Sequence, residues 1–210
     1  MNKYHYDIIQ GTDEWHKMRL LRFTASKASI IKTAGKGLET LVNEMIQAYF
    51  SSGENIEFSK YKNEDMQRGN DYEQSARNVF ELVTGKTVEQ VGCVTVGEHI
   101  LASPDGLIGD DELIEIKCHS DKVFTELILT EKIDTKYIDQ MQYQMWVTGR
   151  KICNYFGYNP NFEPCYFHRV IEADESYFKL FENGVKIGTV MLKEKIKILE
   201  EKGYKPNAEI

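Results

Sequence analysis

Two short apolar runs on either side of a Gly-Asp-Asp turn constrain this chain more than any other feature. They occupy residues 103–117, Ser-Pro-Asp-Gly-Leu-Ile-Gly-Asp-Asp-Glu-Leu-Ile-Glu-Ile-Lys, a pattern typical of a β-hairpin. Such a hairpin brings Asp105 and Glu115 together although they are 10 positions apart in the sequence. Because alternate side chains of a strand face the same side, we expect Glu115 and Lys117 to point toward the space that Asp105 faces.

Two carboxylates with an ammonium group beside them outline a site for a metal ion and a phosphate group. Carboxylate oxygens are ligands for Mg²⁺, and Mg²⁺ held in this way can activate water and neutralise a scissile phosphate. Lys117 could orient or deprotonate the attacking water, or stabilise the phosphate in the transition state. The alternative is an edge strand with an incidental ion pair, but unpaired charges are costly in a strand as apolar as residues 113–117. The hairpin therefore favours phosphodiester hydrolysis.

The charge of the chain is unevenly distributed. The net charge of −7 at first argues against a nucleic-acid partner, because proteins that bind polyanions usually carry a basic face. Residues 1–36, however, hold seven basic residues against three acidic ones, a balance of +4 that leaves −11 for the remainder. An enzyme that binds Mg²⁺ through carboxylates can be acidic overall when a basic patch lies at its site. Net charge alone therefore does not decide the partner.

The basic N-terminal segment carries residue types that suit phosphate. Thr12 is a candidate N-cap for a helix over residues 13–21, and Thr24 opens a second segment over residues 25–31. Hydroxyl groups and helix N-terminal amides donate hydrogen bonds, and the guanidinium of Arg19 offers a planar fork for phosphate oxygens. A solvated helix face explains the same residues equally well, so spacing alone leaves both interpretations open.

The rest of the chain predicts helices around a mixed sheet. Helical spacing of apolar residues extends over residues 38–51, 64–83, 121–129, 135–147 and 174–202. Runs typical of strands occupy residues 87–96, 100–102, 152–158 and 165–171, and the polar residues 54–63 predict a loop. We expect one α/β domain over residues 1–210, with one mixed sheet covered by helices. Glu73 borders the apolar face of its predicted helix, where a side chain can reach inward.

Several other classes of protein are disfavoured. The N-terminus has no apolar leader, and no uninterrupted apolar run reaches about 18 residues, so we expect a cytoplasmic protein without a membrane partner. The four cysteines lack paired spacing, which favours buried reduced thiols over an iron–sulfur cluster. The five histidines form no zinc-binding pattern.

Four blocks of sequence resemble one family of nucleases. Asp105 followed by Glu115-Ile116-Lys117 looks like the signature of the PD-(D/E)xK nuclease superfamily, and the blocks together resemble its phage lambda exonuclease, or YqaJ viral recombinase, branch. In order and spacing they span about residues 11–160. The blocks are Trp15-His16-Lys17-Met18-Arg19-Leu20 with Thr24-Ala25-Ser26; Gly69-Asn70-Asp71-Tyr72-Glu73-Gln74-Ser75-Ala76; residues 103–107 with 113–118; and Tyr137-Ile138-Asp139-Gln140-Met141-Gln142-Tyr143-Gln144-Met145-Trp146-Val147-Thr148.

The resemblance implies a restriction-endonuclease-like core, with a central mixed β-sheet flanked by α-helices, and a metal site within it. Asp105 and Glu115 would be metal ligands, together with the backbone carbonyl of Ile116 and the Glu73 side chain. Lys117 would act on the attacking water. The implied cofactor is Mg²⁺, present as two ions, with Mn²⁺ able to substitute.

Three further residues match family positions outside the metal site. Gln140 matches the glutamine that positions the catalytic lysine. Arg19 and Ser26 match the pocket for the 5′-phosphate of the recessed DNA end. The resemblance therefore implies that the basic segment binds phosphate.

The activity implied by the resemblance is 5′→3′ digestion of one strand of linear double-stranded DNA, which leaves a 3′ single-stranded overhang for phage-type recombination. The resemblance also implies a ring-shaped homotrimer around the DNA, a phage single-strand annealing protein as partner, and a phage or prophage source in a bacterial host. Two other functions stay open: a metal-dependent DNA endonuclease on the same fold, and a DNA-end-binding module without catalysis. The presence of Asp105, Glu115 and Lys117 argues against the module without catalysis.

Overall fold

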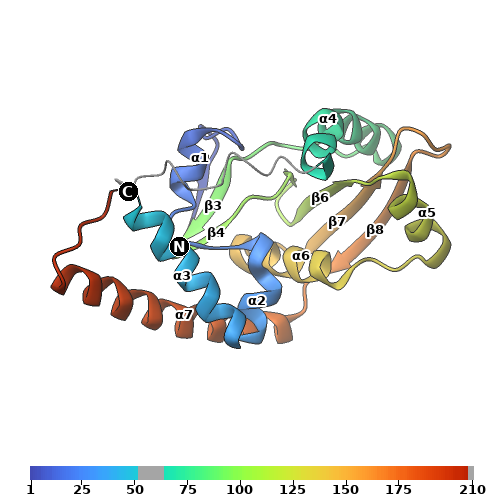
Figure 1. Cartoon of the computed structure of the whole chain (residues 1–210). Helices are drawn as coiled ribbons and strands as arrows, with labels where there is room; N and C mark the ends of the chain where they lie inside the picture. Colours follow the sequence, from blue (N-terminus) through green and yellow to red (C-terminus); the bar gives the residue numbers. More distant parts are fainter. Residues whose placement is uncertain (52–63, 208–210) are drawn as a thin grey trace.

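A computed structural model describes residues 1–51 and 64–207 of the chain as helices packed on strands (Figure 1). The predicted loop over residues 54–63 lies outside the described residues. The strands are β1 (Asn2–His5), β2 (Phe23–Thr24), β3 (Cys93–Val96), β4 (Ile100–Ala102), β5 (Gly106–Ile108), β6 (Glu112–Cys118), β7 (Ile152–Tyr158) and β8 (Tyr166–Glu172). The helices are α1 (Asp13–Met18), the 3₁₀ turn η1 (Ala25–Lys27), α2 (Ala28–Thr33), α3 (Lys36–Phe50), α4 (Glu64–Thr84), α5 (Asp121–Thr130), α6 (Thr135–Thr148) and α7 (Glu175–Glu201).

The strands form two four-stranded sheets rather than the single mixed sheet that the sequence predicts. The strand order is β1-β3-β4-β2 in the first sheet and β5-β6-β7-β8 in the second, and both sheets are mixed. The expected strand over residues 87–96 is divided between them, because only its last four residues form β3 while Glu89 bridges to β5. The chain bends at Gly92, where a Cβ atom would lie 2.1 Å from the carbonyl oxygen of Ile8. The N-terminal segment therefore packs directly against this bend, and the backbone N–H of Gly92 donates to the His5 carbonyl at 3.0 Å.

The hairpin predicted from residues 103–117 is confirmed as β5 and β6. Gly106 lies opposite Ile114, and Ile108 lies opposite Glu112. On its other side β6 pairs in parallel with β7, so it is a central strand of the second sheet. This position explains why β6 is so apolar, and why any charge on it needs a partner.

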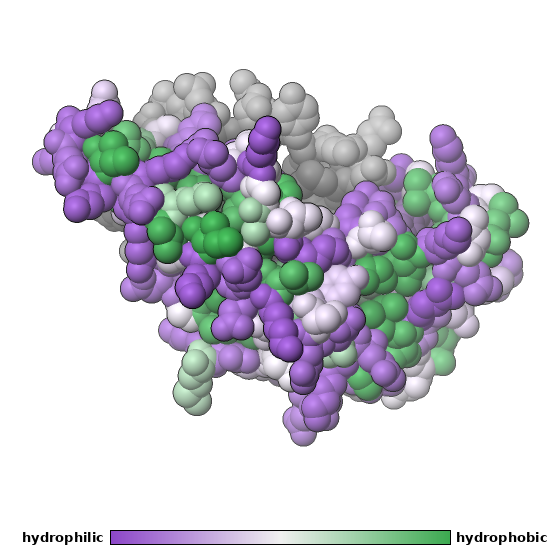
Figure 2. All heavy atoms as spheres, turned by 90° about the horizontal axis from the view of Figure 1, so that it is seen from below, coloured by the Kyte–Doolittle hydropathy of each residue, from purple (hydrophilic) through white to green (hydrophobic). Residues whose placement is uncertain are grey.

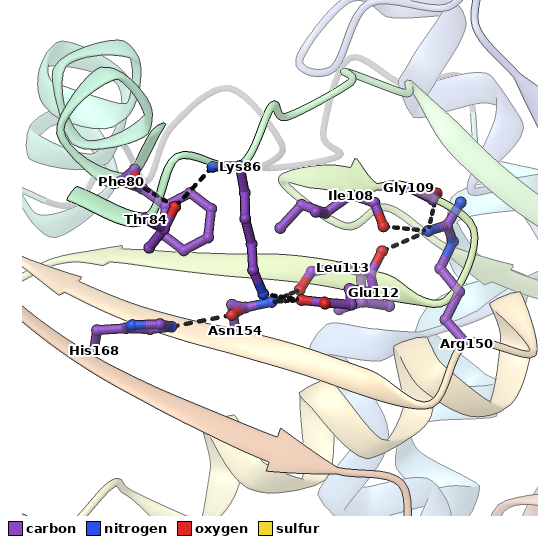
Figure 3. A network of polar contacts seen from close by, with 10 residues as sticks. All are labelled: Phe80, Thr84, Lys86, Ile108, Gly109, Glu112, Leu113, Arg150, Asn154 and His168. Carbon is purple, nitrogen blue, oxygen red and sulfur yellow. Dashed lines mark hydrogen bonds and ion pairs between the residues drawn. The ribbon is translucent and has the colours of Figure 1, made fainter. Parts of the chain in front are cut away.

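A polar network fixes the turn of this hairpin to β7 (Figure 3). The Nη1 atom of Arg150 donates to three carbonyl oxygens around the turn at distances between 2.5 and 3.2 Å, those of Ile108, Gly109 and Glu112. The Glu112 carboxylate accepts hydrogen bonds from Lys86 at 2.5 Å and from Asn154 at 2.8 Å. His168 contacts the oxygen of the same asparagine at 3.0 Å. The register of the hairpin is thus held by side chains as well as by the strand ladder.

The N-terminal helix is shorter than the sequence predicts. The α1 helix ends at Met18 rather than near residue 21, because Leu21 has a φ of 53°, a left-handed conformation that a helix cannot continue through. Its predicted N-cap is confirmed, since the Thr12 hydroxyl accepts a hydrogen bond from the backbone N–H of Trp15 at 3.4 Å.

The other predicted helices, and the strands over residues 100–102, 152–158 and 165–171, are confirmed with ends within two residues of those expected. The short strands β1 and β2 are not predicted from the sequence. Among the apolar residues at helical spacing in α4, Ala76 and Phe80 are buried, whereas Tyr72 and Val83 are exposed at 39% and 43% and so do not join the core.

Helices cover the sheets on two sides (Figure 1). The α4 helix packs on β6 and encloses a smaller apolar core, whereas α2, α3, α6 and α7 surround a larger one. On the face seen from below, hydrophilic side chains cover much of the surface, and apolar side chains gather in groups between them (Figure 2). No helix within residues 1–51 and 64–207 has both the length and the apolar character needed to cross a membrane.

Two glycines allow α7 to lie close to the N-terminal elements. A Cβ atom on Gly184 would lie 1.9 Å from the carbonyl oxygen of Ile31 in α2, and one on Gly188 would lie 2.5 Å from the ring of Phe23 in β2. Both are far below any normal contact distance, so α7 cannot approach this closely with a larger residue. The segment from β2 to α2 is therefore held in place by α7.

We predict that Gly184→Ala lowers the free energy of unfolding by about 1–3 kcal/mol, because the methyl group would overlap backbone rather than a movable side chain. Urea unfolding followed by circular dichroism measures the change. Gly37→Ala is the matched control, since its Cβ would meet Ile30 at an ordinary 3.5 Å and alanine favours the helix. Equal unfolding midpoints for Gly184→Ala and the parent protein would contradict the packing described.

Candidate active site

A cleft of about 950 Å³ contains both groups of residues that the sequence singles out. The predicted hydrolysis centre contributes Glu73 from α4, Asp105 from the residue before β5, Glu115, Ile116 and Lys117 from β6, and Gln140 from α6. The predicted phosphate pocket contributes Arg19, directly after α1, and Ser26 from η1. Residues far apart in the sequence thus line a single cavity.

Glu115 is the most enclosed charged group of the cleft, with 1% of its surface exposed. Its Oε1 atom accepts a hydrogen bond from Gln140 at 2.6 Å and forms an ion pair with Lys117. Its Oε2 atom accepts a hydrogen bond from Gln144 at 2.6 Å. Glu115 and Lys117 therefore point the same way, as the strand pattern predicts. Gln140 contacts the oxygen that pairs with Lys117, so it acts on the lysine through Glu115.

Asp105 lies beside this group and is held by the backbone of β6. Its Oδ2 atom accepts a hydrogen bond from the N–H of Ile116 at 2.6 Å. Burial raises the pKa of Asp105 well above its usual range, and the negative charge of Glu115 raises it further, while Lys117 opposes the shift. The two carboxylates act on each other as like charges, and carboxylate oxygens are the ligands that Mg²⁺ prefers, so the donor set of this pair fits a divalent metal ion.

Lys117 lies between the carboxylates and an aromatic ring. Its Nζ atom is 5.0 Å from the centre of the Tyr137 ring, in cation–π geometry. Burial alone would lower the pKa of Lys117, but the neighbouring Glu115 and Asp105 carboxylates raise it overall. Lys117 is therefore an ammonium ion in this arrangement.

Glu73 lines the cleft but does not join the two carboxylates. Its Oε1 atom accepts a hydrogen bond from Arg77 at 2.6 Å. Within the described ranges, no three His, Cys, Asp or Glu side chains form a group placed to hold a metal ion. Asp105 and Glu115 are thus the carboxylates that could hold one here, and the ligand roles of Glu73 and of the Ile116 carbonyl stay predictions.

The Arg19 pocket has the features of an anion site. The Nη2 atom of Arg19 lies 3.4 Å from the Ser26 hydroxyl and 3.5 Å from the Thr24 hydroxyl, and its guanidinium stacks 4.2 Å from the Trp15 ring centre. Arg19 forms no ion pair with a carboxylate in the part of the chain that the structure describes. Burial lowers the pKa of Arg19 to about 10, so it keeps its charge at neutral pH. Arg19 is only partly buried, and a partly buried cation without a counter-ion favours a bound anion.

Four residues of the site were not predicted from the sequence. Gln144 donates a hydrogen bond to Glu115. Its position one helical turn after Gln140 is the sequence feature that indicates it faces the same group. The Trp15 indole donates to the Ser103 hydroxyl at 2.9 Å, and it lies in a block that resembles the family. The other two carry no sequence signal: Gln10 donates to the Pro104 carbonyl at 3.0 Å, and Arg77 lies 3.3 Å from the Asp105 carbonyl.

Solved structures similar to this chain define its class. The crystal structure of an alkaline exonuclease, LHK-Exo, from Laribacter hongkongensis matches with 34% identity and a TM-score of 0.79, over 91% of this chain and 98% of that chain. The same protein in complex with dAMP matches equally well. A phage-related exonuclease from Haemophilus somnus 129PT shares the fold, at 14% identity and a TM-score of 0.63 over 85% of this chain and 96% of that chain. The expected restriction-endonuclease-like fold is confirmed, and with this site it defines a nuclease.

The family follows from the sequence itself. Residues 14–151 match the YqaJ-like viral recombinase domain. The chain therefore belongs to the YqaJ-like viral recombinase family, as the four sequence blocks indicate. A comparison with curated proteins found no match.

We predict that Arg77→Met lowers the free energy of unfolding by about 1–3 kcal/mol, because Arg77 is buried and its loss leaves the backbone carbonyl of Asp105 without this donor and the Glu73 carboxylate without its partner. Arg169→Met is the matched control. Its ion pair with Glu131 is largely exposed, and such pairs contribute less than about 1 kcal/mol. Urea unfolding of both variants measures the difference. Equal losses of stability would show that Arg77 does not support the site.

Proposed function

We propose that this chain is a Mg²⁺-dependent exonuclease that digests one strand of linear double-stranded DNA from its 5′-phosphorylated end. The product would be a duplex with a 3′ single-stranded overhang, suited to phage-type recombination. The observation that carries the proposal is that the Arg19 pocket and the Asp105–Glu115–Lys117 centre line the same cleft. An enzyme that recognises a terminal phosphate and cleaves a neighbouring one needs both parts side by side.

Each side chain has a role that its contacts support. Mg²⁺ bound by Asp105 and Glu115 would supply an activated water and neutralise charge on the scissile phosphate. Lys117 is held toward the same space by Glu115 and Tyr137, where its ammonium group can orient the water or stabilise the phosphate in the transition state.

The remaining side chains would bind the substrate or orient Glu115. Arg19 and Ser26 would bind the terminal 5′-phosphate through a guanidinium fork and a hydroxyl. Gln140 would keep Glu115 oriented.

The relatives support the exonuclease proposal over the endonuclease. LHK-Exo is an alkaline exonuclease, and its structure with dAMP shows that such a protein accepts a nucleoside monophosphate. A mononucleotide is the product expected from stepwise digestion of a strand. By the same resemblance we propose a ring-shaped homotrimer that encircles DNA, a phage single-strand annealing protein as partner, and Mn²⁺ as a substitute for Mg²⁺.

We predict that the protein releases a 5′ label from linear duplex DNA as a mononucleotide before it removes a 3′ label from the same strand. The reaction should need Mg²⁺ and stop when EDTA is added. Glu115→Gln and Lys117→Ala should each slow the reaction at least about 100-fold, because they remove a ligand and a transition-state charge. Denaturing gels of 5′- and 3′-labelled duplexes measure both polarity and rate.

Lys197→Ala serves as the control, since Lys197 is an exposed lysine on α7. It should digest DNA at the parent rate. Early loss of the 3′ label would contradict the proposed direction. Rapid cutting of covalently closed circular DNA would show an endonuclease instead.

A further inference from the structure

Gln144 is a buried side chain that contacts Glu115, a residue of the cleft. The proposed mechanism gives Gln144 no role. None of its surface is exposed. Its Nε2 atom donates to the Oε2 atom of Glu115 at 2.6 Å. Its own Oε1 atom is buried and has no hydrogen-bond partner among the residues that the structure describes. The amide nitrogen of Gln144 thus makes a hydrogen bond, whereas its carbonyl oxygen makes none to the described residues.

A contribution to folding stability alone does not explain this amide. A buried carbonyl oxygen without a donor loses its hydration and gains nothing in exchange. An apolar side chain of similar length would fill the same space without that cost. The glutamine is therefore explained by its one hydrogen bond, which goes to Glu115.

Gln142, two residues earlier on α6, shows what a structural glutamine looks like in this chain. It is also buried, with 3% of its surface exposed. Its Nε2 atom donates to the carbonyl of Glu172 at 2.7 Å, and its Oε1 atom accepts from the N–H of Asp174 at 2.9 Å. Both halves of that amide join α6 to the segment between β8 and α7, so Gln142 contributes to the fold and lies away from the carboxylates.

The position of Gln144 complements that of Gln140. The two glutamines are four residues apart and so lie on the same face of α6, one turn from each other. Gln140 donates to one oxygen of Glu115 and Gln144 donates to the other. A carboxylate with donors on both oxygens has a fixed plane, whereas a carboxylate with a donor on one oxygen can rotate about its last bond.

We propose that Gln144 is a positioning residue that fixes the carboxylate plane of Glu115 for a divalent metal ion. This inference rests on the proposed function, because it assigns Glu115 to metal binding. Partners that orient a ligand in this way typically change metal affinity by about 10- to 100-fold when they are removed. In this role Gln144 would determine metal affinity through Glu115, without itself lining the cleft.

The test is calorimetric titration of Mn²⁺ into the protein without DNA. We expect Gln144→Met to raise the dissociation constant of Mn²⁺ by about 10- to 100-fold. The matched variant Gln142→Met should leave that constant unchanged but lower the midpoint of thermal unfolding more than Gln144→Met does. If Gln144→Met does not fold, Gln144→Asn replaces it, because the shorter amide cannot reach Glu115.

The outcomes separate this inference from the proposed function. If the parent protein binds Mn²⁺ and Gln144→Met binds it equally well, Gln144 has no positioning role and the proposed function stands. If Gln142→Met weakens Mn²⁺ binding as much as Gln144→Met does, the effect is one of general folding and the inference fails. If the parent protein binds no Mn²⁺, the proposed metal dependence itself is wrong, and the inference falls with it.

Discussion

The burial of the Glu115 charge is the constraint on which the rest of the site depends. A carboxylate with 1% of its surface exposed is stable in a central strand only when protein groups replace its lost hydration. Those groups are the ammonium of Lys117 on the same strand and the amides of Gln140 and Gln144 on α6. Because both glutamines must reach β6, the position of α6 against the second sheet is fixed by the same interactions that hold the charge.

The same helix also supports the segment that carries the Arg19 pocket. The hydroxyl of Tyr143 donates to the backbone carbonyl of Phe23 at 2.8 Å, directly before the residues that carry the pocket hydroxyls. Asp139, which is 3% exposed, pairs with Lys32 of α2 at 2.5 Å. One helix therefore sets the distance between the carboxylate centre and the Arg19 pocket. In the proposed function, an acidic chain would receive the DNA end through a single arginine that has no carboxylate partner among the described residues.

The sequence predicts the centre of the site well because the interactions there are local. The hairpin pattern predicts that Asp105 and Glu115 lie close together. The alternation of side chains along a strand predicts that Glu115 and Lys117 point to the same side. The phosphate-binding role of Arg19 and Ser26 was predicted only from the resemblance. Residue spacing alone is explained equally well by a solvent-exposed helix face. The two separate sheets were not predicted, because the break between the Glu89 bridge and β3 lies at Gly92, which packs against Ile8 far away in the sequence. Arg77 and Gln10 were missed for a similar reason: each acts on a backbone carbonyl far away in the sequence.

In the proposed function, one cleft binds a 5′-phosphate and cleaves the strand beside it. The most direct test compares the digestion rates of linear duplexes with 5′-phosphate and 5′-hydroxyl ends, for the parent protein and for Arg19→Ala. We predict that the parent protein prefers phosphorylated ends by about 10- to 100-fold, the value of one charge-assisted hydrogen-bonded contact. Arg19→Ala should lose most of that preference while keeping the parent rate on 5′-hydroxyl ends. Equal rates of the parent protein on both kinds of end would contradict the proposed recognition of the 5′-phosphate.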